Sequence, residues 1–347
     1  MTATFELTDD LAADRPPEER GLARDQVRML VGSPSGIEHR RFADLPGSLR
    51  PGDLVVVNTS ATLAAAVDGQ RRDGRDVTVH FSTSQDDGTS LVELRPVRNA
   101  TGPVPDAVAG EVVRLPVGVA VTLLSAHSAS APTRLWRARI DVEGGLEAYL
   151  ARHGRPIRYS YVDGRWPLSA YQTVFARHPG SAEMPSAGRP FTAELVTSLV
   201  TAGVAVAPIT LHTGVSSLEE GEPPLAERFT VPPATARQVN LTKASGGRIV
   251  AVGTTVTRAL ETVAHVDGWV DGGSGWTDLV LGPERPARTV DGLITGWHAP
   301  GASHLQLLEA VAGSDLVDAA YGSAVRERYL WHEFGDSCLL LPDREAA

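Results

Sequence analysis

Residues 248–258 read RIVAVGTTVTR, in which a short apolar run meets a glycine and then a segment with helical character. The run 249–252 predicts a buried strand, and residues 254–264 predict a helix that follows it directly. A buried strand that leads straight into a helix is typical of sheets in which strands and helices alternate. This stretch therefore points to an α/β fold with a parallel or mixed sheet.

The turn between that strand and helix is also a candidate binding site. Gly253 lets the backbone turn closely, and the free N–H groups at the start of a helix attract an anion. Thr254 and Thr255 add hydroxyl donors, and Arg258, one turn later, supplies positive charge. A carboxylate, a phosphate or a ribose would fit there, although an ordinary capped helix is an equally simple interpretation. The Walker lysine and the GxGxxG spacing are absent, which argues against nucleoside triphosphates and NAD.

Further elements of the same kind flank this stretch on both sides. Pro51-Gly52-Asp53 predicts a turn, and Thr192 predicts an N-cap for a helix that buries Leu195, Leu199 and Val200 and ends at Gly203. The remaining expected elements are strands at 54–57, 204–211 and 278–281 and helices at 234–244, 303–312 and 315–330. Their alternation predicts an α/β body with a largely parallel or mixed sheet.

The pattern between about Val67 and Asp141 is different. Short runs of alternating or β-branched residues are separated by Gly, Pro and Asp, and they lie at 77–81, 91–94, 121–124 and 135–140. Regularly spaced short strands without helical periodicity predict a small barrel or sandwich. We therefore expect a discontinuous body formed by residues 1–62 and 146–347, interrupted by an inserted β-barrel domain at 63–145.

Composition sets limits on the class of protein. The chain has 347 residues, of which 42% are hydrophobic, and its net charge is −10. No apolar run is long enough to cross a bilayer, the N-terminus has no evident signal peptide, and the single cysteine excludes an internal disulfide, so a cytoplasmic protein is expected. Two arginine clusters, at 71–75 and 134–139, could be solvated strand faces or a nucleic-acid patch.

Three further places carry side chains that could do chemistry. His212 follows the strand at 204–211, where ligands gather in α/β sheets, and could move a proton, although a lone histidine is more often structural. The loop 291–300 contains Asp291, Trp297 and His298, and such loops often line pockets. Trp276 and Asp278 lie at a strand edge. The sequence contains no HExxH motif, cysteine pair or close carboxylate series, so no metal site is expected.

Taken in order, these pieces resemble the family of S-adenosylmethionine:tRNA ribosyltransferase-isomerases along nearly the whole chain. The matching segments are Phe5-Glu6-Leu7, Pro17–Arg20, Pro51–Asn58, Tyr171–Phe175, Pro185–Gly188, Thr210-Leu211-His212, Val252–Thr255, Gly275–Asp278, Asp291 with His298 and Pro300, and Glu327-Arg328-Tyr329 with Gly335-Asp336. The resemblance implies an α/β body with an inserted β-barrel. It also implies that S-adenosylmethionine donates a ribosyl unit to an aminomethyl-deazaguanine base in the tRNA anticodon loop, giving epoxyqueuosine, adenine and methionine.

This chemistry requires proton transfers and a site for a charged donor. The resemblance suggests His212, His298 and Glu227 for the catalytic steps. The residues expected to hold S-adenosylmethionine are Gly253, Thr254, Thr255, Arg258, Trp276, Asp278, Asp291 and Trp297. An aromatic ring could stack on adenine or face the sulfonium. No metal is expected to take part.

The sequence also departs from the family pattern in several polar positions. Ser60-Ala61 and Ala64–Ala66 stand where the family has two arginines, and Pro190 and Gly296 replace a histidine and an asparagine. The segment 215–227 keeps only Glu227 of a run that is rich in histidine. Two alternatives therefore stay open beside the tRNA reaction. One is related chemistry on a small-molecule acceptor, and the other is a non-catalytic protein that binds S-adenosylmethionine or a nucleoside.

Overall fold

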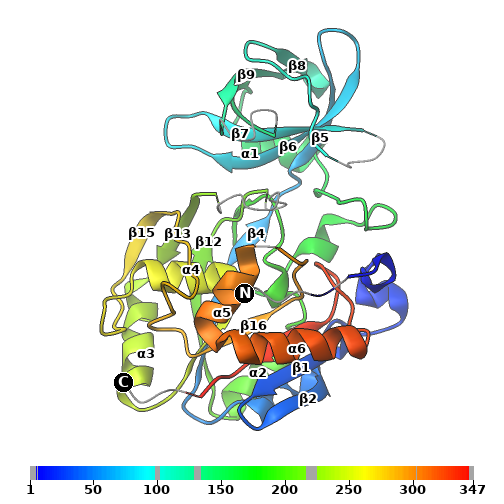
Figure 1. Cartoon of the computed structure of the whole chain (residues 1–347). Coiled ribbons are helices and arrows are strands. Elements are labelled where there is room, and N and C mark those ends of the chain that lie inside the picture. The colour runs from blue at the N-terminus through cyan, green and yellow to red at the C-terminus, as the bar shows by residue number, and fades with distance from the viewer. Residues whose placement is uncertain are drawn as a thin grey trace.

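The computed structural model describes residues 5, 7–97, 102–128, 134–215, 225–301 and 303–343. A β-barrel stands on a larger α/β body, and the chain passes from the body into the barrel and back again (Figure 1). The predicted fold class, a mixed-sheet α/β body with an inserted barrel, is confirmed. The domain limits at 63 and 145 stay a prediction, and the barrel strands occupy 66–141.

The body is built on a nine-stranded mixed sheet with the order β15-β13-β12-β3-β14-β16-β17-β1-β2. Its centre is parallel, because β12, β14 and β3 run side by side in the same direction and β14 pairs in parallel with β16. The strands are β1 (Arg28–Ser33), β2 (Gly36–Arg41), β3 (Leu54–Asn58), β12 (Ala205–Leu211), β13 (Glu227–Val231), β14 (Ile249–Val252), β15 (Gly273–Thr277), β16 (Gly292–Thr295) and β17 (Ser337–Leu340). The predicted strands at 54–57, 204–211 and 249–252 are thus confirmed to within a residue.

Strand β3 shows how the sheet is buried on both faces. Successive side chains of a strand point to opposite faces. Leu54 and Val56 belong to one apolar core, while Val55 and Val57 belong to another, and each is 2% exposed or less. An uninterrupted apolar run is the sequence signature of such a strand, because neither face meets water.

Helices cover both faces of the sheet. Helix α2 (Ala193–Thr201) contributes to one core, and α3 (Pro233–Ala244), α4 (Thr254–Thr262), α5 (Ser303–Ala312) and α6 (Ser314–Arg326) contribute to the other. Figure 1 shows α5 and α6 on the same side of the body. The predicted cap is present, because the Thr192 side chain accepts a hydrogen bond from the Leu195 amide at 3.1 Å. None of the helices in the described residues is long and apolar enough to cross a membrane.

Three details differ from the sequence-based prediction. The strand expected at 278–281 lies at Gly273–Thr277 instead, since β13 pairs with those residues and the carbonyls after them turn toward Arg258. Helix α6 ends at Arg326, because Arg328 has a positive φ of 53° that no regular helix continues. Val200 is 57% exposed, so α2 buries a narrower face than expected.

The inserted domain is a closed six-stranded barrel with the order β10-β7-β6-β5-β8-β9. Its strands are β5 (Ala66–Gln70), β6 (Asp76–Ser84), β7 (Ser90–Pro96), β8 (Val112–Arg114), β9 (Ala120–Ala126) and β10 (Leu135–Asp141), and helix α1 (Leu146–His153) follows. The four strands predicted inside the barrel region are confirmed. Closure removes the unpaired edges that an open sheet of this size would expose.

The arginine clusters of the barrel are largely paired with carboxylates. Arg71 is 5% exposed at its side chain and bonds Asp106 and Glu111, each at 2.5 Å. Arg137 forms an ion pair with Asp87, and Arg139 lies 3.4 Å from Asp141. These partners offset much of the positive charge that a nucleic-acid patch would need.

Several contacts join the barrel to the body, and two of them involve different strands of the body. A small parallel sheet pairs β4 (Ser60–Thr62), which leads into the barrel, with β11 (His178–Ser181) of the body. On another side, Asp86 from the turn between β6 and β7 accepts a hydrogen bond from Trp276 at 2.8 Å. Asp86 also forms an ion pair with Arg228, whose guanidinium lies over the Trp276 ring. The β6–β7 hairpin is thereby fastened to strands β13 and β15.

Candidate active site

A cavity of about 460 Å³ lies at the carboxyl ends of the central strands. Its lining includes the turn after β14, the end of β16, the segment 213–215 that follows β12, part of helix α5 and the segment 156–161 that returns from the barrel. The size falls within the range of small-molecule sites, and its position is where ligands bind in open α/β sheets.

The turn predicted to bind an anion forms part of this lining. Gly253 has φ 93°, and a Cβ at this position would lie 3.3 Å from the Ala187 Cβ. Thr254 and Thr255 begin α4 and border the cavity, and Asn58 donates to the Thr255 hydroxyl at 3.3 Å. The first N–H groups of an α-helix have no partner inside the helix, and the helix dipole adds positive potential there. The turn can therefore receive a carboxylate or another anionic group.

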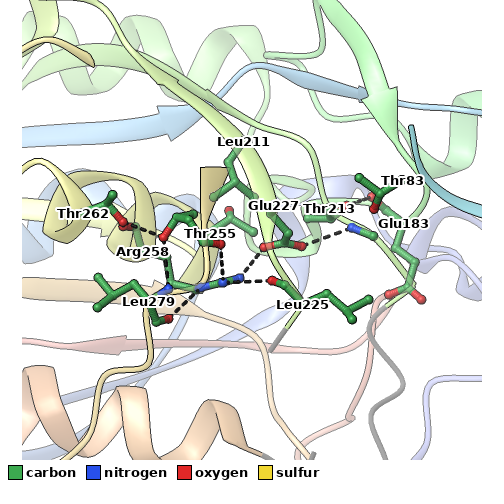
Figure 2. Close-up of polar contacts among 12 residues, drawn as sticks. Thr83, Glu183, Leu211, Thr213, Leu225, Glu227, Thr255, Arg258, Thr262 and Leu279 are labelled. Carbon is green, nitrogen blue, oxygen red and sulfur yellow. Dashed lines mark hydrogen bonds and ion pairs between the residues drawn. The ribbon is translucent and has the colours of Figure 1, made fainter. Parts of the chain in front are cut away.

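Arg258 borders the cavity, but protein groups use its donors. It forms a buried ion pair with Glu227, and its guanidinium also donates to the carbonyls of Leu225 and Leu279, each at 3.1 Å (Figure 2). A further hydrogen bond goes to the Thr277 carbonyl at 3.0 Å. Arg258 and Glu227 are each 7% exposed. This arrangement fastens α4 to β13 and β15, so Arg258 builds the wall beside the helix start.

Glu227 is similarly engaged on both of its oxygens. One oxygen pairs with Arg258, and the other accepts a hydrogen bond from the Gly214 amide at 3.1 Å. The carboxylate therefore ties the segment after β12 to the start of β13 and to α4. In this geometry Glu227 holds the cavity wall in place, and its catalytic role stays a prediction.

Two imidazoles stand together at the cavity. His298 and His304 stack with ring centroids 4.6 Å apart, and the Thr295 hydroxyl lies 3.0 Å from the His298 Nε2. Burial holds the pKa of His298 well below its usual value and lowers the pKa of His304 to about 4. Both rings are therefore neutral at pH 7, and a neutral imidazole can accept a proton.

Trp297 lies next to His298 but packs mainly into the core. It is 2% exposed, and its ring meets Tyr321 edge-on at 4.9 Å and lies 5.5 Å from Trp331. Trp297 is among the residues that border the cavity, yet this aromatic cluster surrounds most of its ring. Trp297 is therefore better placed to anchor the His298 loop to the core than to stack on a ligand.

The remaining predicted residues lie outside the cavity lining. His212 is half-buried behind it, with its Nδ1 2.8 Å from the Ser60 hydroxyl. Asp291 accepts a hydrogen bond from the Ile249 amide at 2.8 Å, which places it at the opposite end of β14. Trp276 bonds Asp86 of the barrel, and Asp278 is exposed. The structure thus gathers His298, Glu227, Gly253, Thr254, Thr255, Arg258 and Trp297 at one cavity and leaves these four elsewhere.

Several cavity residues were not singled out from the sequence. They are His304, Tyr159, Tyr161, Glu183, His332 and Glu333. His304 lies six residues after His298, on the helix predicted to follow the loop, and this spacing could have suggested it. The others come from three places far apart in the chain, at 159–161, 183 and 332–333, and no local pattern connects them. In the described part of the chain, no group of three His, Cys, Asp or Glu side chains is placed to hold a metal ion.

An α/β body with an inserted six-stranded barrel, and a cavity lined by apolar and polar groups at its strand ends, defines a class of two-part α/β proteins. The comparisons with known proteins identify the family within it. The family model described as "Queuosine biosynthesis protein" matches residues 2–340, and the chain belongs to this family, as its motifs had indicated.

Similar proteins cover the chain almost completely. It is 34% identical to a protein of Moorella thermoacetica, over 97% of this chain and 98% of the other, and 37% identical to a protein of Symbiobacterium thermophilum with the same coverage. Both relatives are named S-adenosylmethionine:tRNA ribosyltransferase-isomerase. A crystal structure of S-adenosylmethionine tRNA ribosyltransferase from Thermotoga maritima matches with a TM-score of 0.54 and 28% identity, covering 98% of this chain and 99% of that one.

Parts of the region that departs from the family pattern lie outside the described residues. This applies to 216–224, within the segment where the family's histidine run is expected. Glu227, which the chain keeps, lies in the described part and forms the ion pair with Arg258. At Gly296, which replaces an asparagine, the backbone borders the cavity and a Cβ would meet nothing within 4 Å.

Proposed function

We propose that this protein is an S-adenosylmethionine:tRNA ribosyltransferase-isomerase of queuosine biosynthesis. It transfers the ribosyl unit of S-adenosylmethionine to the aminomethyl-deazaguanine base of tRNA, isomerises it to epoxyqueuosine, and releases adenine and methionine. One observation carries the proposal: the Gly253–Thr255 turn opens into the cavity in a chain that matches enzymes of this name along almost its whole length. The tRNA substrate supports a cytoplasmic location.

The cavity offers complementary groups for the donor. The methionine carboxylate would lie against the N–H groups at the start of α4, where the helix dipole favours negative charge. The Thr254 and Thr255 hydroxyls can bond a carboxylate or a ribose. Because the donors of Arg258 are used by Glu227 and by backbone carbonyls, this arginine supports the donor site through α4 without direct contact.

Proton transfer in the reaction falls to groups at the same cavity. The sulfonium acidifies the neighbouring ribose 5′ hydrogens, so a positioned base can remove one of them. The neutral imidazole of His298 has the required form at pH 7, and the Thr295 hydroxyl orients it. His304, stacked on the His298 ring, limits its rotation. We infer that His298 is the base on the donor side.

One observation favours a second candidate, the same donor chemistry on a small-molecule acceptor. The net charge is −10, and acidic partners neutralise arginines of both barrel clusters. Proteins that bind nucleic acid through phosphate contacts usually present a basic surface. An acceptor without phosphates would not need one.

A product assay separates these possibilities. The chain is incubated with S-adenosylmethionine and with tRNA that carries the aminomethyl base, and the nucleosides are analysed by mass spectrometry. Epoxyqueuosine supports the proposed function. Release of adenine and methionine without tRNA favours the small-molecule acceptor. Tight donor binding with no product from any acceptor indicates a binding protein. Under the proposed function the KM for tRNA also rises steeply with salt, because phosphate contacts release counterions.

A further inference from the structure

A second wall of the cavity carries acidic and aromatic groups that the donor site does not use. The rings of Tyr159 and Tyr161 stack at 5.9 Å, and Tyr161 stacks on His332 at 4.1 Å. Each tyrosine hydroxyl donates to a carboxylate, Tyr159 to Glu183 and Tyr161 to Glu333. All five residues border the same cavity as the start of α4. This wall therefore presents carboxylates held by phenol hydroxyls, which suits a cationic group.

Glu333 is the carboxyl of this wall whose surroundings are most unusual. Tyr161 Oη donates to its Oε2 at 2.6 Å, although 172 residues separate the two. Burial raises the pKa of Glu333 to about 7, while the Tyr161 hydrogen bond and the charge of Arg189 act in the opposite direction. Other titratable groups near it include Tyr171 and Asp336, whose pKa values burial raises, and His332, whose pKa burial lowers. At neutral pH the carboxyl can thus both hold and accept a proton.

We propose that Glu333 is the proton acceptor for the amine of the acceptor base, and that Tyr161 positions its carboxylate. The inference rests on the proposed function, in which the acceptor carries an aminomethyl group. That group is an ammonium in water and must be neutral to attack carbon. One N–H bond of the ammonium breaks and its proton moves to the Glu333 carboxylate, which becomes a carboxylic acid. The electron pair left on nitrogen is then available to attack the ribosyl unit, whose bonds to adenine and to the methionine sulfur break in the overall reaction.

Two other carboxyls, Glu183 and Glu227, border the cavity among the described residues. Glu227 pairs with buried Arg258, and protonation would break that pair. Glu183 is held by Tyr159 in a similar way to Glu333, so it is the direct rival within the wall. The neighbourhood of Glu333 differs because the chain adopts a positive φ of 71° at His332, which stacks that imidazole on Tyr161 beside the carboxyl. The Tyr161 ring thus contacts the rings of both Tyr159 and His332, which fix its position.

The test measures kcat against pH with the tRNA acceptor for the wild-type chain, Glu333→Gln, Tyr161→Phe and Glu183→Gln. We expect wild-type kcat to fall about tenfold per pH unit below pH 7, as the carboxyl becomes protonated. Glu333→Gln should no longer show this fall of kcat below pH 7, which is the acid limb of the profile. Its kcat at pH 8 should be at least about 100-fold lower than that of the wild-type chain. Tyr161→Phe should move the limb to higher pH, because the lost hydrogen bond had stabilised the charged carboxylate.

Two matched substitutions control for effects on folding. Glu309→Gln makes the same change at a buried carboxyl of α5 outside the cavity lining, and Tyr149→Phe removes a hydroxyl that donates to Pro116 at 3.2 Å in the barrel region. Both should keep the wild-type pH profile. An unchanged profile in Glu333→Gln, or loss of the limb in Glu183→Gln instead, would overturn the inference while leaving the proposed function in place. A wild-type chain that makes no epoxyqueuosine would overturn both.

Discussion

The imidazole rings of His298 and His304 lie face to face, with their centroids 4.6 Å apart and their planes within 2° of parallel. Two charged imidazoles could not share this position, because each would repel the other in a buried setting. Burial lowers the pKa of His298 most, and the neighbouring imidazoles of His304 and His332 lower it further. The pair therefore keeps a neutral base beside the donor turn throughout the neutral pH range.

His304 is buried in its neutral form, and this predicts how the free energy of unfolding changes with pH. Its pKa is about 4 in the folded chain, against 6.5 for an ordinary histidine, so between these values the unfolded chain binds the extra proton. The free energy of unfolding is therefore unaffected by titration of His304 above pH 6.5, and it decreases as the pH falls from 6.5 toward 4. His304→Gln should remove on the order of 1–3 kcal/mol of this pH dependence. Urea unfolding of both proteins at pH 7 and pH 5 measures it, and equal pH dependence would contradict the assignment.

Replacement of His298 should reduce catalysis more than replacement of His212. His298 borders the cavity, whereas His212 lies behind it against the Ser60 hydroxyl. We expect His298→Ala to lower kcat by about 100-fold or more, the usual contribution of a general base. His212→Ala should lower kcat less. Single-turnover rates with saturating donor compare the two variants, and a larger loss in His212→Ala would reverse their assignment.

Gly253→Ala should impair donor binding beyond its effect on stability. The new Cβ would meet Ala187 at 3.3 Å, on a backbone with φ 93° at the cavity. Gly52→Ala is a matched control, because Gly52 has the same φ of 93° and a Cβ there meets nothing within 4 Å. Both should cost about 1–2 kcal/mol of stability through the left-handed backbone. Calorimetry with S-adenosylmethionine should show weaker binding only for Gly253→Ala, and equal affinities would contradict the placement of the donor.

The buried ion pair of Arg258 and Glu227 should be sensitive to removal of either partner. Arg258→Ala leaves an unpaired carboxylate that is 7% exposed and also removes three hydrogen bonds to carbonyls. We expect a loss of about 3–5 kcal/mol in unfolding free energy. Arg258→Lys should recover only part of it, because an ammonium cannot reproduce the guanidinium's fixed set of donors. Arg40→Ala, at an exposed pair with Glu38, is the control and should cost less than about 1 kcal/mol.

Much of the fold could be predicted from the sequence because its signals are local. The apolar runs at 54–57 and 249–252 and the Thr192 cap specify their elements from neighbouring residues alone. The turn at Gly253, which borders the cavity, was singled out for the same reason, since Gly253 and the threonines are adjacent, and its part in donor binding stays a prediction. The strand at 273–277 was misplaced because the partner strand β13, and not the local pattern, decides which residues pair.

The second wall of the cavity could not be predicted in this way. Tyr161 and Glu333 meet only when the segment returning from the barrel folds against the one that follows α6, and 172 residues separate them in the chain. Asp291 shows the converse, because its place in a pocket-like loop suggested a ligand contact. Its carboxylate bonds the Ile249 amide at the far end of β14 instead. Side-chain direction depends on tertiary packing, which single-sequence patterns do not encode.

The shape of the turn at Gly253 is set before any ligand arrives. Its amide donates to the Ile294 carbonyl at 2.8 Å, and its carbonyl accepts from the Thr257 amide at 3.2 Å, so neighbouring strand and helix hold both peptide groups. A flexible loop would lose conformational entropy on closing around the donor, and affinity would fall accordingly. Because folding already fixes both peptide groups of Gly253, we expect little further loss of entropy when an anion binds at the helix start.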